Sequence, residues 1–276
     1  MNKKIDVLNH GYVSLDSWMP WNMVDLQNAI LLGDIDKAKS LLHKDDLGAV
    51  NAAKASFAKR SDDLEGREER LIDYLARNHE NSPFRHNVIR FEIYAPLLVA
   101  RQWFKYRVGS RHSEDSAEIL NVYMGQGDQE GFDDPLHAWN ETSRRYVTLD
   151  PEFYNPEIWR LAPDNRKQGS GDNLEDNELA EYIQQKLIDY QKEGLDLYNF
   201  CNESGLAPEL TRLFLPAYGL FISWQWTASI VSVCHFLQQR LADNAQKEIQ
   251  EYAQAIFTLA KQVYPISMEK IMEYST

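Results

Sequence analysis

Positively charged residues gather in one short window of a chain that is otherwise acidic. The formal net charge is −13, yet four cations and no carboxylate occur from Arg101 to Arg111. A second run at 140–146, with the sequence Asn-Glu-Thr-Ser-Arg-Arg-Tyr, adds two arginines beside hydroxyl and amide groups. The planar fork of arginine gives two parallel hydrogen bonds to phosphate oxygens, and a local excess of cations attracts a small anion. These residue types therefore indicate a phosphate-binding site.

The first window has a simpler interpretation when it is taken alone. Arg101 and Lys105 are four residues apart, so both could belong to the solvated face of an ordinary helix. For this window by itself, the solvated face is the favoured interpretation. The second run changes the balance because of what the two segments resemble together.

The two segments resemble the two-part signature of the flavin-dependent thymidylate synthases of the ThyX type. That signature reads Arg-His-Arg-x-x-Ser, followed by Asn-Glu-x-Ser-x-Arg-Tyr, and its second half is complete at 140–146. The first half differs, because Lys105-Tyr106-Arg107 stands where the family has Arg-His-Arg, while Ser110 fits. The spacer 111–139 is far longer than the family's and predicts a loop insertion. The resemblance covers most of the chain, excepting about the first fifty residues, the spacer and part of 161–180.

The resemblance implies an activity and its small-molecule partners. The family makes dTMP from dUMP, with methylenetetrahydrofolate as the carbon donor and reduced FAD as the hydride donor, and NADPH reduces the flavin. The family also assembles as a homotetramer whose active sites are shared between chains. Partners of this chain would then be dUMP and its own copies, without nucleic acid or membrane.

The resemblance also implies which residues form the site. Carbon 5 of uracil is a poor nucleophile, so an enzyme of this family must stabilise negative charge on the ring, and Arg240 would do this electrostatically. Arg240 is therefore a catalytic candidate, and Ser143, in the second motif segment, is the other. The residues expected to bind dUMP are Gln102, Lys105, Glu141, Ser143, Arg144, Arg145, Arg212 and Arg240. The residues expected to contact FAD are Ser56, Ser82, Tyr106, Arg107, Val108, Ser229, His235 and Asn244.

Departures from the family pattern concentrate on the flavin side. Ser229, Val231 and His235 stand where the family has Asn, Arg and Asn, and Asn244 stands where a His is common. Three interpretations follow, and we favour the first, a divergent but working synthase. The second is a relative that modifies another pyrimidine nucleotide or transfers a different one-carbon group. The third is a nucleotide-binding homologue that has lost flavin catalysis.

Other chemical constellations carry less weight. Cys234-His235 echoes the nucleophile motif of the classical thymidylate synthases, but the preceding Pro is missing and the pair lies in a predicted helix, so Cys234 is expected to be a small buried group. Ser143 has no general base nearby in sequence and is expected to hold phosphate rather than act as a nucleophile. The acidic residues of the spacer lack the spacing of a calcium-binding loop, and no metal site is predicted.

Composition limits the class of protein. The 276 residues are 43% hydrophobic and 12% aromatic, which allows a sizeable core in a single domain over 1–276. The acidic balance argues against general nucleic-acid binding. We expect neither a membrane span nor a signal peptide, because no long apolar run occurs. Two cysteines without metal or disulfide spacing fit a reducing cytoplasm.

The hydrophobic pattern predicts an α/β (α+β) fold with a mostly antiparallel sheet flanked by long helices. Strands are expected near 4–13, 87–95 and 218–227, and the segment after Trp18 is expected to be a loop. Helices are expected at 34–47, 66–78, 97–105, 178–202, from 208, at 229–241 and at 245–264. In helix 178–202 the residues expected to face the core are Leu179, Ile183, Leu187, Tyr190 and Leu197.

Overall fold

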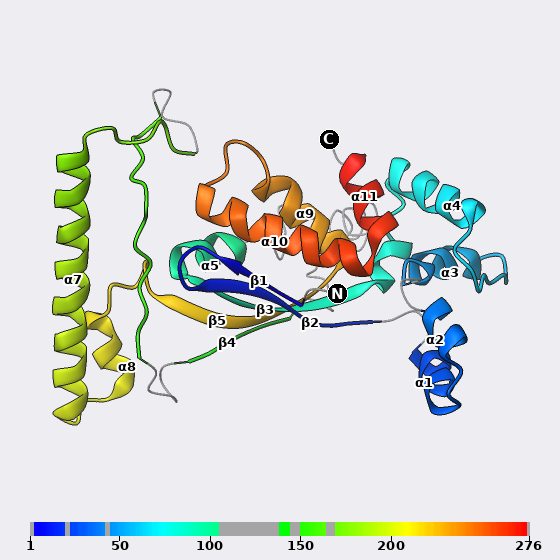
Figure 1. Ribbon diagram of the computed structural model, residues 1–276, viewed down its shortest axis with the longest axis horizontal. Helices are drawn as coiled ribbons and strands as arrows, with labels where there is room; N and C mark the ends of the chain where they lie inside the picture. The colour runs from blue at the N-terminus through cyan, green and yellow to red at the C-terminus, as the bar shows by residue number, and fades with distance from the viewer. Residues whose placement is uncertain are drawn as a thin grey trace, which may run out of the picture.

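A five-stranded antiparallel sheet forms the centre of the molecule (Figure 1). A computed structural model describes residues 3–19, 23–41, 45–104, 138–143, 150–163 and 169–274. The strands are β1 (Lys4–Val7), β2 (Gly11–Trp18), β3 (Val88–Pro96), β4 (Ala138–Glu141) and β5 (Phe221–Ser229), in the spatial order β1-β2-β3-β5-β4. The pairing of β3 with β5 joins segments far apart in the chain, from Val88 opposite Ser229 to Pro96 opposite Phe221.

Alternating side chains make one face of this sheet apolar. Ile89, Phe91 and Ile93 on β3 are fully buried, as are Trp224 and Trp226 on β5. This period of two is what a strand requires when one of its faces meets the core. Figure 1 shows α9 (Ile230–Arg240), α10 (Lys247–Val263) and α11 (Pro265–Glu273) lying on one side of the sheet.

Two tyrosine hydroxyls tie the C-terminal helices to the strands. Tyr252 on α10 donates to the carbonyl of Tyr94 at 2.9 Å. Tyr264, between α10 and α11, donates to the carbonyls of Met19 and Val88, both at 3.0 Å. Burial raises the pKa of both phenols, so both hydroxyls stay protonated donors.

A second group of helices, α3 (Leu47–Ala55) and α4 (Gly66–Arg77), packs beside α11. Buried Asp46 accepts hydrogen bonds from the backbone amides of Ile266 and Ser267 at 2.9 Å each. It therefore caps the first turn of α11 from a distant part of the chain, which satisfies amides that lack a helical partner.

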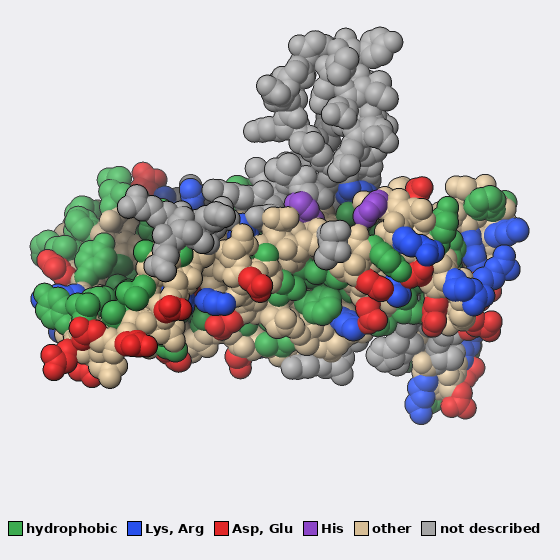
Figure 2. All heavy atoms as spheres, turned by 90° about the horizontal axis from the view of Figure 1, so that it is seen from above, with side chains coloured by type: hydrophobic (Ala, Val, Ile, Leu, Met, Phe, Trp, Pro, Cys, Tyr) green, Lys and Arg blue, Asp and Glu red, His purple; other side chains and the backbone are tan. Residues whose placement is uncertain are grey.

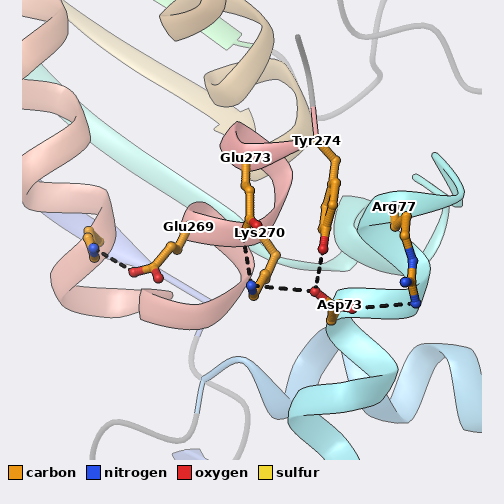
Figure 3. Close-up of polar contacts among 7 residues, drawn as sticks. Asp73, Arg77, Glu269, Lys270, Glu273 and Tyr274 are labelled. Carbon is orange, nitrogen blue, oxygen red and sulfur yellow. Dashed lines mark hydrogen bonds and ion pairs between the residues drawn. The ribbon is translucent and has the colours of Figure 1, made fainter.

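Asp73 forms a second link between α4 and α11. It accepts a hydrogen bond from Tyr274 at 2.8 Å and pairs with Lys270 at 3.4 Å and Arg77 at 3.5 Å (Figure 3). Lys270 also pairs with Glu273 at 2.7 Å. The hydrogen bond from Tyr274, together with the nearby cations, holds the pKa of Asp73 below its usual range.

The longest helix, α7 (Asn177–Glu203), stands at one end of the molecule together with α8 (Pro208–Thr211) and η3 (Arg212–Phe214) (Figure 1). A small cluster of Tyr198, Leu215 and Leu220 joins it to the segment before β5. Gly194 permits this packing, because a Cβ there would lie 2.5 Å from the carbonyl oxygen of Phe214. The remaining helical elements are α1 (Met23–Leu31), α2 (Ile35–Leu41), η1 (Pro83–His86) and α5 (Leu97–Trp103).

The predicted fold class and the antiparallel sheet are confirmed, with differences in the elements. The opening strand is a hairpin of β1 and β2, and the segment after Trp18 contains α1 rather than only a loop. In place of the helix expected at 34–47, α2 ends at Leu41 and α3 begins at Leu47. Ala138 and Trp139, the last residues of the loop expected at 111–139, belong to β4, and the insertion itself stays a prediction. The helix α11 was not predicted.

The face assigned to α7 is wrong for three of its residues. Leu179, Tyr190 and Leu197 are 44%, 58% and 42% exposed. The amphipathic pattern located the helix correctly but could not show which side this chain covers. Among all the described residues, no helix is long and apolar enough to cross a membrane.

Candidate active site

Three of the residues predicted to bind nucleotide line one pocket. Glu141, Ser143 and Arg212 come from β4, the residues after it, and η3. The pocket has a volume of about 580 Å³, and its other lining residues are Leu97, Thr142, Leu215, Ala217, Leu220 and Ile222. A cation, a carboxylate and a hydroxyl above an apolar floor suit a small ligand with an anionic group and a flat ring.

The sheet places Glu141 and Ser143 at this pocket. β4 is an edge strand whose Glu141 lies opposite Trp224 of β5. Trp139, two residues earlier, stacks on Trp224 with ring centroids 4.7 Å apart. The backbone amide of Thr142 donates to Ser223 at 2.9 Å and extends the pairing to the pocket. The stacked indoles thus anchor a strand of only four residues.

Arg212 reaches the pocket from a second, distant segment of the chain. α8 begins at Pro208, because Pro suits a first helical turn, and η3 follows directly after α8. The Nε of Arg212 donates to the carbonyl of Glu209 at 3.2 Å. Desolvation raises the pKa of the Glu141 carboxyl, whereas a hydrogen bond from Trp139 and the charge of Arg212 oppose that rise. The guanidinium and the carboxylate therefore act on each other across the pocket.

Gln102 and Arg240 form a second group, on α5 and α9. Both are half-buried, and the Nη1 of Arg240 donates to the Oε1 of Gln102 at 3.5 Å. The Nε2 of Gln102 donates to the Oε1 of Gln246, the residue before α10. The predicted nucleotide residues that the structure describes thus form two groups, one at the pocket and one where α5, α9 and α10 meet.

The residues predicted to contact flavin lie in different settings. Ser56 and Ser82 are exposed at the end of α3 and the start of η1, two elements that pack together. His235 is half-buried on α9, and burial lowers its pKa, which favours a neutral ring. These polar groups fit a cofactor that needs hydrogen-bond partners at a surface. Asn244 is exposed in the turn before α10.

Ser229 has a role inside the fold. It is completely buried, its hydroxyl accepts from the amide of Ser232, and it caps the first turn of α9. Val231 is also buried, in the core cluster, where the family has an arginine. The hydroxyl of Ser229 is thus already used inside the fold. Its predicted contact with flavin stays a prediction.

Six of the predicted site residues fall outside the described part of the chain, and their roles stay predictions. Three of them are expected to bind dUMP and three to contact FAD, in that order in the list that follows. They are Lys105, Arg144, Arg145, Tyr106, Arg107 and Val108.

The expectation for Cys234 is confirmed. Its side chain is fully buried, its Sγ lies 3.7 Å from the sulfur of Met268, and burial raises the pKa of the thiol. A buried thiol with a raised pKa is a packing group and not a nucleophile.

Polar residues beside Gln102 were missed as functional candidates from sequence. Gln246 contacts Gln102, buried Glu248 accepts from Gln246, and Arg160 pairs with Glu248. The available signal was the Gln-x-Glu sequence at the start of an amphipathic helix, with Gln246 at the N-cap and Glu248 in the first turn, because polar side chains there can contact another element. No spacing rule connects that pair to Arg160, 88 residues away in the chain.

Comparisons with known proteins agree on one family. The family model described as "Thymidylate synthase complementing protein" matches residues 40–266. A flavin-dependent thymidylate synthase of Thermus thermophilus is 32% identical over 230 residues, which are 83% of this chain and 73% of the relative. That of Borreliella burgdorferi is 28% identical over 276 residues, covering 97% of this chain and 82% of the relative.

A solved structure shares the fold. It is a UMP/dUMP methylase, PolB from Streptomyces cacaoi, bound with 5-Br dUMP, with a TM-score of 0.68, 20% identity and coverage of 98% of each chain. The antiparallel sheet with its covering helices and the polar pocket at β4 define an α+β enzyme with a small-molecule site. The chain belongs to the family of flavin-dependent thymidylate synthases, a family of methyltransferases.

Proposed function

We propose that this chain converts dUMP to dTMP, with methylenetetrahydrofolate as carbon donor, FAD as hydride carrier and NADPH as the reductant of the flavin. Family membership supports the reaction class. The observation that carries the proposal within the chain is the pocket that gathers Glu141, Ser143 and Arg212 from two distant segments.

The chemistry of these side chains suits a nucleotide monophosphate. Arg212 supplies a charged fork for the phosphate, and Ser143 adds a hydroxyl donor. Glu141 accepts hydrogen bonds from a sugar hydroxyl or a ring N–H. The apolar side chains of Leu97 and Ile222 provide a surface for the flat pyrimidine.

Gln102 and Arg240 would face the pyrimidine. The guanidinium of Arg240, half-buried and held by Gln102, is suited to stabilise the charge that develops on the ring during carbon transfer. FAD supplies the hydride, and Ser56, Ser82, His235 and Asn244 are the described residues that would hold it.

The active form is proposed to be a homotetramer in which neighbouring chains complete each site. Two observations support this assembly. The described nucleotide residues of one chain fall into two groups, and large apolar side chains are exposed on α7 and nearby. Figure 2 shows hydrophobic side chains gathered at the end of the molecule that α7 occupies in Figure 1. Both cysteines, Cys201 and Cys234, are free and buried, which suits the cytoplasm we propose for the enzyme.

The experiment that tests this function is a visible absorption spectrum of the purified protein. We expect flavin bands after addition of FAD, and a shift of those bands when dUMP follows, because the two ligands share a site. Product analysis with methylenetetrahydrofolate and NADPH should then give dTMP, with UMP as the comparison substrate.

Two results would contradict the proposal. Binding of dUMP without any bound flavin would favour a nucleotide-binding homologue. Turnover of UMP in preference to dUMP would instead assign the chain to another pyrimidine nucleotide.

A further inference from the structure

A continuous line of hydrogen bonds runs from Arg240 into the interior. Arg240 donates to Gln102, Gln102 donates to Gln246, and the Nε2 of Gln246 donates to the Oε2 of Glu248 at 2.8 Å. The line crosses three elements, α9, α5 and the start of α10. It ends at a carboxylate that is only 3% exposed.

Glu248 is held in place on its other side. Its Oε1 accepts from the Nη2 of Arg160 at 2.5 Å and from the hydroxyl of Tyr154 at 3.0 Å. Both partners come from the segment 150–163, which meets the first turn of α10 through these two hydrogen bonds. A buried carboxylate is costly unless several donors satisfy it, and here three donors meet its two oxygens. The position of Glu248 in the first turn of α10 adds the favourable field of the helix N-terminus.

The chemistry of each group gives the line a single direction. A carboxylate only accepts hydrogen bonds, so Gln246 must turn its NH₂ toward Glu248. Its carbonyl oxygen is then left to face Gln102, which must offer its own NH₂. The carbonyl of Gln102 is consequently directed at Arg240, a side chain that only donates. One negative charge thus sets the orientation of two amides in succession.

We propose that Glu248 is a positioning residue, which acts through Gln246 to fix the side-chain orientation of Gln102 and so the placement of Arg240 in the nucleotide site. This inference rests on the proposed function, in which Gln102 and Arg240 bind dUMP. Arg160 and Tyr154 hold the carboxylate in turn, and Glu248 itself touches no substrate.

The sharpest test exchanges the amide of Gln246 and the carboxylate of Glu248. Glu248→Gln keeps the shape but can present an NH₂ to Gln246, which reverses both amides and directs an NH₂ at Arg240. The double variant Gln246→Glu/Glu248→Gln restores a carboxylate next to Gln102, so Gln102 regains its original orientation. Glu251→Gln is the matched control, because Glu251 lies one turn further along α10 and outside this line of hydrogen bonds.

We expect Glu248→Gln to weaken dUMP binding about tenfold, the effect of one misdirected hydrogen bond to a charged group. Isothermal titration calorimetry would measure the Kd for dUMP, and steady-state kinetics would separate KM from kcat. The double variant should recover most of the affinity, and Glu251→Gln should match the wild type. A merely structural role for Glu248 would lower thermal stability without this reversal of affinity.

Two outcomes would overturn the proposal in distinguishable ways. If the wild type binds dUMP and Glu248→Gln binds it equally well, the positioning role fails while the proposed function stands. If the wild type itself binds no dUMP, the proposed function fails and this inference falls with it.

Discussion

Arg212 and Arg240, two arginines of the proposed nucleotide site, lie in different surroundings. Arg212 is exposed at the junction of α8 and η3, beside the pocket. Arg240 is half-buried at the end of α9 and contacts Gln102. Residue types and motif spacing could identify these side chains because the motifs are short stretches of sequence. How they group depends on packing between distant elements, which local patterns do not encode.

The same limit explains what was missed around Glu248. A Gln and a Glu at a helix start look like ordinary polar residues of a first turn. Their function follows only from Arg160 and Gln102, which reach them from other parts of the chain. The aromatic anchor of β4 is similar, since Trp139 meets Trp224 only after the strands pair.

At the residue scale, replacement of Arg240 by Ala should abolish most methylation while the fold survives. Loss of one charge-stabilising group typically lowers kcat by about 100- to 1000-fold. Turnover of dUMP would be measured beside the circular dichroism spectrum of the variant. Arg67→Ala, at an exposed position on α4, serves as the control. Near-normal turnover of Arg240→Ala would remove Arg240 from the catalytic assignment.

At the scale of elements, strongly periodic segments were predicted well. The helix expected at 66–78 is observed as α4, Gly66–Arg77, because its apolar side chains repeat along one face. The strand expected at 87–95 is observed as β3 for the same kind of reason. By contrast α11 was missed, since Pro265 reads as the end of a pattern but here begins a new helix.

The turn between α3 and α4 is held by a buried ion pair and its neighbours. Lys54 on α3 pairs with Glu68 on α4 at 2.6 Å, and the hydroxyl of Ser61 donates to the same carboxylate oxygen at 2.7 Å. Asn51 exchanges two hydrogen bonds with the backbone of Ser61. This network closes the loop that follows Ser56, so it supports a segment expected to contact flavin.

This network predicts a specific dependence of stability on pH. Hydrogen bonds from Lys54 and Ser61 lower the pKa of Glu68 to about 2. A carboxyl whose pKa is lower in the folded state stabilises the protein above its unfolded pKa of about 4.3 and loses that contribution as pH falls toward 2. Between pH 5 and pH 2 the free energy of unfolding should therefore fall by about 1–2 kcal/mol more in the wild type than in Glu68→Gln. This figure is reduced for solvent screening.

Urea unfolding of both proteins across this pH range would measure the effect. Glu69→Gln, the exposed neighbour on α4, is the control and should follow the wild-type curve. Parallel curves for the wild type and Glu68→Gln would show that the ion pair contributes no pH-dependent stability.

At the scale of the whole molecule, α7 is the feature that a single chain leaves unexplained. Tyr182 and Phe200 on this helix are 61% and 65% exposed, and Leu213 of η3 is 77% exposed. Exposed apolar surface of this extent marks an interaction site. Periodicity predicts a helix with an apolar side but does not say what covers that side, and the homotetramer proposed above would cover it.

We expect the wild type to have about four times the chain mass of 32.1 kDa. The double variant Tyr182→Glu/Phe200→Glu should form smaller species, because charges at an apolar interface are costly. Light scattering coupled to gel filtration would measure both masses. Tyr74→Glu, at a residue 54% exposed on α4, provides the control. A monomeric wild type, or an unchanged mass for the double variant, would contradict the assembly.

The cap that Asp46 places on α11 has a consequence for synthesis on the ribosome. Asp46 and its partners Ile266 and Ser267 are separated by about 220 residues of chain. The carbonyl of Val88 likewise accepts a hydrogen bond from the hydroxyl of Tyr264, far along the chain. The first helices and strands therefore emerge with polar groups that only the last part of the chain can satisfy. We therefore expect these contacts to form late in translation, after the segment that carries Tyr264, Ile266 and Ser267 has been made.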